Sequence, residues 1–120
     1  MKVIKHYRLR TGSAAFVLHR LSGLGLMAYL PLHIYVTGTL TGGPESFNRT
    51  MAFVDTPLFH FLEWGLFGVI LYHAFNGLRL ILADFGVWDD LAGQKRMFWV
   101  AVAVGGAAWL ASFPVLLGLL

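Results

Sequence analysis

Long apolar segments alternate with short polar ones along this chain. The apolar segments cover about residues 14–40, 57–83 and 97–120. Each is longer than the roughly 20 helical residues that cross the hydrocarbon core of a bilayer. The pattern therefore predicts an all-α integral membrane protein, in which three transmembrane helices form a single domain over residues 1–120.

The composition agrees with this fold class. Of the 120 residues, 58% are apolar and only 12% are charged, a balance that differs from that of water-soluble chains. The sequence has no cysteine, which excludes disulfides, thiolate metal sites and cysteine-held iron–sulfur clusters within this chain. A metal bound here would need nitrogen ligands, and the chain offers five histidines.

The basic residues predict how the chain is oriented. They gather before the first apolar segment and beside the start of the third. Because the cytoplasmic ends of membrane helices are enriched in Lys and Arg, we predict a cytoplasmic N-terminus and a multi-pass chain of three crossings. This role accounts for the net charge of +3 without a nucleic-acid partner. The basic residues outside the apolar segments that are predicted on the cytoplasmic side are Lys2, Lys5, Arg8, Arg10, Lys95 and Arg96, and Arg49 is predicted on the opposite side.

Costly polar residues interrupt the second apolar segment. The stretch 73–86, HAFNGLRLILADFG, places His73, Arg79 and Asp84 along a segment that otherwise resembles a membrane-buried helix, where ionisable side chains are usually functional. His73 lies roughly 15 Å from the cytoplasmic end. Gly77 removes bulk from the same helical face, as if a flat group packed there. We interpret His73 as a haem ligand, with a hydrogen bond between helices as the alternative.

A second polar group lies in the first apolar segment. His19, Arg20 and Ser22 fall within about two turns of its cytoplasmic end, at the same level as Arg79 and Asp84. Taken alone, Arg20 is typical of a residue that extends its charge to the membrane surface, and Ser22 of a contact between helices. Together they predict a pocket at the membrane edge for a polar headgroup such as a quinone ring.

Two other patterns are interpreted as packing. The segment 23–28, GLGLMA, matches a dinucleotide-binding fingerprint, but no strand precedes it and its surroundings are a membrane helix. The third segment carries a stripe of small residues at helical spacing. Two helices that bury polar groups make a poor self-contained bundle, so partner chains are expected. The stripe consists of Ala101, Gly105, Ala108 and Ser112.

The polar motifs, in order and across three apolar segments, resemble a known family. HRLSG at 19–23 and HAFNGLRLILADFG at 73–86 are similar to the motifs of the cytochrome b556 membrane-anchor subunits of succinate dehydrogenase, respiratory complex II. The resemblance covers nearly the whole chain. It implies a multi-pass subunit in the cytoplasmic membrane of a bacterium or archaeon, which is not itself catalytic toward succinate but belongs to a succinate:quinone oxidoreductase.

The resemblance also implies partners and cofactors. A second membrane-anchor subunit would bundle with these helices and supply the other axial haem ligand. FAD would lie in a flavoprotein subunit and the iron–sulfur clusters in an iron–sulfur subunit, with a quinone as the electron acceptor. A higher oligomer such as a trimer is compatible with this family. The direction of the reaction and the choice between menaquinone and ubiquinone stay open.

Specific residues take their expected roles from the resemblance. His73 matches the axial ligand to the iron of haem b, and His19 and Arg20 match residues near the haem propionates, which Arg79 can also reach. Arg20 also belongs to the quinone site. The remaining residues of that site are Ser22, Asp84 and Phe16, the last at a position where some members of the family have a serine.

His33 is a candidate ligand for a second haem. It follows His19 by fourteen residues, or roughly 20 Å along a helix, so the two cannot share one site. In the two-haem members of the family, a first-helix histidine at similar spacing binds the second haem iron. A hydrogen bond across helices is the alternative, so one haem or two stays open. His60 and Glu63 are interpreted as polar residues of the outer interface.

Two other functions remain open at this point. The chain fits a subunit of another dihaem b-type membrane cytochrome, although such cytochromes more often carry paired histidines in a single four-helix bundle. It also fits a haem-free membrane assembly or transport subunit, in which the histidines would be structural. The haem spectrum of the assembled complex separates these hypotheses.

Overall fold

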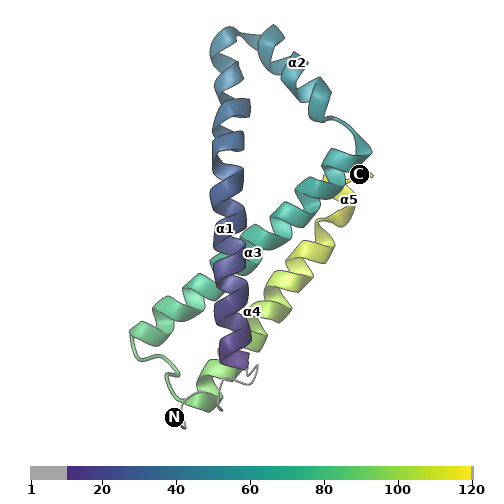
Figure 1. Ribbon diagram of the computed structural model, residues 1–120. Helices are drawn as coiled ribbons and strands as arrows, with labels where there is room; N and C mark the ends of the chain where they lie inside the picture. The colour runs from purple at the N-terminus through teal and green to yellow at the C-terminus, as the bar shows by residue number, and fades with distance from the viewer. Residues whose placement is uncertain (1–10, 120) are drawn as a thin grey trace.

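The computed structural model describes residues 11–119 (Figure 1). Within this range every regular element is a helix, which confirms the all-α prediction. The N-terminal basic residues Lys2, Lys5, Arg8 and Arg10 lie outside the described residues. The helices are α1 (Thr11–Gly38), η2 (Thr39–Gly42), α2 (Pro44–Val54), α3 (Pro57–Asp84), α4 (Leu91–Ala111) and α5 (Phe113–Leu116).

Two of the three predicted membrane helices meet the length and hydropathy expected of a crossing helix. They are Ser13–Gly42, which combines α1 with η2, and Pro57–Asp84, which is α3. Thr56 caps the start of α3, because its side-chain oxygen accepts a hydrogen bond from the Phe59 amide at 3.4 Å and Pro57 follows as the first helical residue. A membrane crossing by α4 stays a prediction.

The bounds of α4 differ from the predicted segment 97–120. The helix begins at Leu91, within polar sequence, because the Asp90 carboxylate caps it by accepting a hydrogen bond from the Gly93 amide at 3.2 Å. It ends at Ala111, and the short helix α5 follows with Pro114 in its first turn. Proline cannot donate the backbone hydrogen bond that would continue α4, so the apolar run is divided between two helices.

The three long helices contact one another pairwise. Figure 1 shows α4 running alongside α3. The helix α1 crosses α3 at a steep angle near the middle of α3. Beyond the crossing α1 and α3 diverge, and η2 and α2 bridge their separated ends. The α1–α3 crossing is therefore the place where residues from the first and second apolar segments meet.

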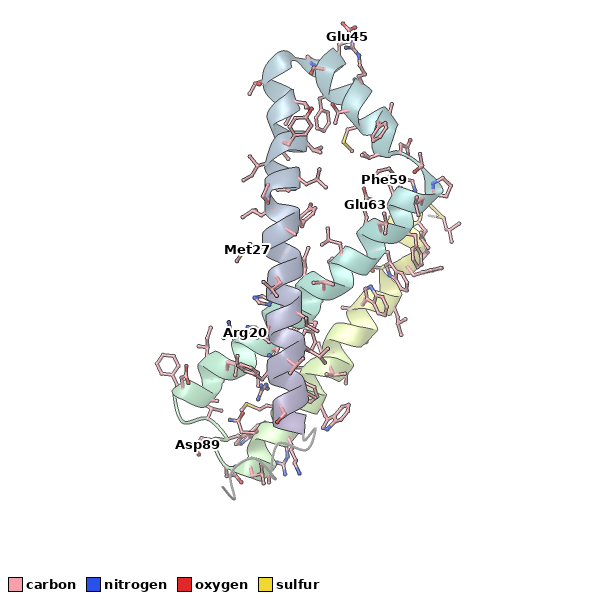
Figure 2. All side chains as sticks on the ribbon, viewed as in Figure 1. Arg20, Met27, Glu45, Phe59, Glu63 and Asp89 are labelled. Atoms are coloured by element: carbon pink, nitrogen blue, oxygen red, sulfur yellow. The ribbon has the colours of Figure 1, made fainter. Side chains whose placement is uncertain are left out.

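Few side chains are buried in this fold. The buried apolar residues are Ala15, Met97 and Phe98, whereas most large apolar side chains are exposed. Met27, for example, is 70% exposed, and Figure 2 shows it projecting from α1 away from α3. Apolar exposure of this extent is expected of helices that face lipid tails or other helices instead of water.

A pair of tryptophans joins α3 to α4 at the ends near α5. The rings of Trp64 and Trp109 stack with centroids 4.1 Å apart and an interplanar angle of 9°. Each indole N–H donates to the backbone carbonyl of the other tryptophan, at 3.0 Å from Trp64 and 2.8 Å from Trp109. This reciprocal contact fixes the register of the two helices.

Candidate functional site

Two histidine rings from different helices stack at the α1–α3 crossing. The centroids of His19, from α1, and His73, from α3, lie 4.1 Å apart, with an interplanar angle of 9°. The residues are 54 positions apart in sequence, as the numbering shows (73 − 19). The two polar motifs singled out in the sequence are therefore in direct contact.

Ser22 connects the same two residues through its hydroxyl group. Its Oγ donates a hydrogen bond to the backbone carbonyl of His19 at 2.8 Å and lies 2.9 Å from Nδ1 of His73. The side chain is only 8% exposed. The sequence predicted Ser22 as part of a quinone pocket, with a contact between helices as the alternative, and its hydroxyl makes such a contact with the His73 ring.

Two glycines leave room for the stacked rings. A Cβ atom added at Gly23 would lie 3.2 Å from Cε1 of His73, a closer approach than most real Cβ atoms make. A Cβ added at Gly77 would lie 3.7 Å from Cε1 of His19, in ordinary contact. Gly23 thus allows His73 to sit against α1, and Gly77 faces the other ring across the crossing.

The geometry of His73 suits an axial ligand to haem iron. Such a ligand binds iron in the plane of its ring, through a nitrogen that carries no proton. His19 covers the face of the His73 ring and Ser22 engages Nδ1, and within residues 11–119 no group forms a hydrogen bond with Nε2. Nε2 is therefore the nitrogen of this ring that no hydrogen bond engages within the described residues.

His19 cannot be the second axial ligand of the same iron in this arrangement. Two axial ligands point at the metal from opposite sides, whereas the two rings lie face to face. Among the described residues no group of three or more His, Cys, Asp or Glu side chains could hold a metal ion. Nδ1 of His19 is buried and has no hydrogen-bond partner in the described part of the chain.

Arg79 is buried, but it points toward α4 and not toward His73. The side chain is 8% exposed; its Nε donates to Oδ1 of Asn76 at 2.9 Å, and its Nη1 donates to Oε1 of Gln94 at 2.8 Å. Both partners are neutral, and the described residues supply no carboxylate to pair with the guanidinium. A buried cation without an anion is costly, so the site favours a negatively charged group nearby.

The contacts of Arg79 extend to the connection between α3 and α4. Gln94, which accepts from Arg79, donates through Nε2 to the backbone carbonyl of Trp88 at 3.3 Å. Trp88 has a φ of 48°, a left-handed conformation that is uncommon for a bulky residue. Arg79 and Gln94 therefore hold this connection against the ends of α3 and α4, a role that the sequence did not suggest.

The other residues predicted for the quinone site are spread over two surfaces. The guanidinium of Arg20 lies 5.4 Å from the centroid of the Phe16 ring, and both side chains are exposed on α1. Figure 2 shows Arg20 close to the α1–α3 crossing. Asp84 is exposed at the end of α3 and forms no hydrogen bond or ion pair with another described side chain. The structure joins Arg20 with Phe16 but brings neither into contact with Asp84.

His33 lies on the part of α1 that diverges from α3. Its ring is exposed, and Nδ1 lies 3.0 Å from the hydroxyl of Tyr29. The spacing of four residues places Tyr29 on the same helical face, so the sequence contained this signal but the prediction missed it. His60, on α3, pairs with Asp55 at 2.9 Å, and Glu63 is exposed one turn further along the helix (Figure 2).

A cavity of about 600 Å³ lies between α1, α3 and α4. Its lining is mostly apolar and includes Phe75 and Phe98, with Ser22, Tyr72 and Asn76 as polar members. The Tyr72 hydroxyl is already engaged, because it donates to the backbone carbonyl of Ala15 at 3.1 Å.

Comparison with known proteins relates the chain to one family. Residues 2–112 match the family model described as succinate dehydrogenase/fumarate reductase transmembrane subunit. The succinate dehydrogenase 2 membrane subunit SdhC of Mycobacterium tuberculosis is 34% identical over 99 residues, which cover 82% of this chain and 71% of the relative. The succinate dehydrogenase hydrophobic membrane anchor subunit of Halobacterium salinarum is 34% identical over 107 residues, or 88% and 81% of the two chains.

A third relative is more distant. The succinate dehydrogenase cytochrome b556 subunit of Coxiella burnetii is 28% identical over 74 residues, which cover 61% of this chain and 59% of the relative. The matched residues 2–112 span both polar motifs and the whole α1–α3 crossing.

Proposed function

Because the chain belongs to the succinate dehydrogenase/fumarate reductase transmembrane subunit family, we propose that it binds haem b through His73 and forms part of the site where a quinone receives electrons. The chain is a membrane-anchor subunit of such a complex, as the family and the relatives indicate. The observation that carries the haem assignment is the His73 ring, which is held by Ser22 and His19 with Nε2 left available.

His73 would hold the haem iron, and a second membrane-anchor subunit would supply the opposite ligand. Haem b supplies a one-electron carrier whose reduction potential depends on its axial ligands, hydrogen bonds and burial. The name cytochrome b556 of the Coxiella relative supports a b-type haem. The soluble partners are a flavoprotein subunit with FAD and an iron–sulfur subunit, which deliver the electrons.

Cationic and polar side chains around the crossing would receive the haem propionates. Arg20 is exposed beside the stacked histidines, and Nδ1 of His19 has no partner within the described residues. Arg79 was also assigned to the propionates from the sequence, but it faces α4 and donates to Asn76 and Gln94, so no propionate is placed on it. A propionate near Arg20 and His19 would neutralise charge that the described residues leave unpaired.

The quinone site would lie at the cytoplasmic edge of the membrane. Quinone reduction consumes two electrons and two protons, so the site needs both apolar walls and access to water. Arg20 would donate hydrogen bonds to a quinone oxygen, and Phe16 would pack against the ring. Asp84 is exposed and lies at the end of α3, where it can take protons from water. Ser22 was also assigned to this site from the sequence, but its hydroxyl is engaged by the His19 carbonyl and by Nδ1 of His73.

His33 would hold a second haem. Its Nδ1 contacts a hydroxyl, as does Nδ1 of His73, and its ring is exposed on the open face of α1. Two haems at these separated levels would connect the two sides of the membrane and couple the reaction to the membrane potential.

The bacterial and archaeal sources of the relatives support a location of this chain in the cytoplasmic membrane.

The haem assignment is tested on the purified complex. The reduced-minus-oxidised spectrum should show a b-type signal, and the ratio of haem to flavin should be two if His33 is a ligand and one if it is not. His73→Ala should remove the inner haem, whereas His60→Ala, which changes a histidine of the same helix that pairs with Asp55, should leave it in place. A His73→Ala complex with full haem content would refute the proposal, and a complex without any b-type signal would support a haem-free anchor.

A further inference from the structure

The hydroxyl of Ser22 has two neighbours and only one proton to donate. Its Oγ lies 2.8 Å from the His19 carbonyl oxygen, which can only accept, and 2.9 Å from Nδ1 of His73, which can donate or accept. With the Ser22 proton directed to the carbonyl, the second contact forms only if Nδ1 of His73 carries a proton and donates it to Oγ. Since a neutral imidazole has one N–H, Nε2 is then unprotonated.

We infer that Ser22 is a positioning residue that fixes the tautomer and the orientation of His73 for iron ligation. This inference rests on the proposed haem site at His73. A metal-bound histidine commonly donates its other N–H to an acceptor, which fixes the ring and increases its basicity. Ser22 is that acceptor, and its own bond to the backbone of α1 holds the hydroxyl in the accepting orientation.

The surrounding packing makes the bond specific to Ser22. The hydroxyl is 8% exposed, so water has little access to replace it. Gly23 allows the edge of the His73 ring near Nδ1 to approach α1, because a Cβ there would lie 3.2 Å from Cε1. The face of the ring is covered by His19. The ring is thus constrained at one edge and one face, with Ser22 as its hydrogen-bond acceptor.

The inference is tested by the reduction potential of the haem in the assembled complex. A hydrogen bond accepted from Nδ1–H increases electron donation to iron and favours its oxidised state. Potentiometric titration should therefore show a higher midpoint potential in Ser22→Ala than in the unmodified complex. Ser22→Thr retains the hydroxyl and should restore the original potential. The electron paramagnetic resonance signal of the oxidised haem, which reports ring orientation, should change in Ser22→Ala and not in Ser22→Thr.

A matched control exists on α4. Ser112 makes the same kind of bond three residues back, from Oγ to the Trp109 carbonyl at 2.6 Å, without contacting a histidine. Ser112→Ala should leave the haem potential unchanged. If Ser22→Ala assembles but contains no haem, and Ser22→Thr regains it, the inference is also supported.

Several results would overturn the inference that Ser22 positions the His73 ring. An unchanged potential and resonance signal in Ser22→Ala would exclude a bond to the haem ligand, and so would a Ser22→Thr variant that behaves like Ser22→Ala. A raised quinone KM with an unchanged potential would assign Ser22 to the quinone site alone. Haem that persists in His73→Ala would instead defeat the proposed function itself, so the two failures are distinguishable.

Discussion

Gly23 controls how closely the His73 ring approaches α1. In Gly23→Ala, the new methyl group would meet Cε1 of His73 at 3.2 Å, so the ring must shift by a few tenths of an ångström. Overpacking of this kind costs about 1–3 kcal/mol, partly offset by about 1 kcal/mol from the higher helix propensity of alanine. We expect lower haem retention during detergent washing and a shifted haem absorption band, both measured on the purified complex.

Gly25 provides the matched control for Gly23. A Cβ at Gly25 would meet no atom within 4 Å, so Gly25→Ala introduces the same propensity change without the contact. Haem content and spectrum should then match those of the unmodified complex. Equal loss of haem in both variants would indicate that the first helix as a whole, and not the approach of His73, is sensitive to substitution.

From the sequence, the residues that meet at the α1–α3 crossing could be predicted better than the neighbouring helix that each side chain faces. His19 and His73 could be found because imidazoles are costly in lipid, and the structure places them in contact. Arg79 was grouped with His73 because both lie on one segment. Six residues of helix separate them by about 120° around the axis, so Arg79 faces α4 while His73 faces α1. The hydroxyl of Ser22 likewise reaches His73 only because of how α1 and α3 cross.

At the level of the helices, Gly68 allows α3 and α4 to approach at the tryptophan pair. A Cβ at this position would lie 2.7 Å from Nε1 of Trp109, and the rigid indole cannot move without losing its bond to the Trp64 carbonyl. Gly68→Ala should therefore destabilise the α3–α4 pair by about 1–3 kcal/mol. The measurement is the thermal transition of the detergent-solubilised complex, followed by tryptophan fluorescence, and it should fall by several degrees.

Gly65 lies on the same helix and meets no atom within 4 Å of an added Cβ. Gly65→Ala should leave the transition temperature unchanged or raise it slightly, because alanine favours the helix. If Gly68→Ala were equally harmless, the close α3–α4 approach would be wrong. A partner subunit seated over Gly65 would be revealed by destabilisation of the control.

The helices themselves were predictable to different degrees. The bounds of α3 follow directly from hydropathy and from the Thr56 cap. The start of α4 was placed too late because the capping Asp90 and the first helical turn lie in polar sequence, where hydropathy gives no signal. The helix α2, in which Glu45 and Arg49 form an exposed ion pair at 3.1 Å, lies in the polar segment between the first two apolar segments, where hydropathy gave no signal of a helix.

At the level of the whole chain, the described helices leave a large apolar surface exposed. Their large apolar side chains are mostly exposed, and their buried interior contains Asn76 and Arg79 with neutral partners. Lipid and partner helices would cover such a surface, as expected for a membrane-anchor subunit. The sequence indicated that partners are needed, but the surface that they cover depends on the angle between α1 and α3 and could not be predicted.

The number of membrane crossings is testable on the whole chain, because a sequence without cysteine accepts single-cysteine probes. Glu45 and Asp89, labelled in Figure 2, and Leu119 are all exposed and lie after α1, α3 and α4 respectively.

If all three helices cross and the N-terminus is cytoplasmic, Glu45→Cys and Leu119→Cys should react in intact cells with a thiol reagent that cannot cross the membrane. Asp89→Cys should then react only after the cells are opened, which is also the control that each site is accessible. Labelling is read on this subunit after electrophoretic separation from cysteine-containing partners. Leu119→Cys that reacts only in opened cells, like Asp89→Cys, would show that α4 returns to the cytoplasmic side without crossing, because a helix that spans the membrane must place its two ends on opposite sides.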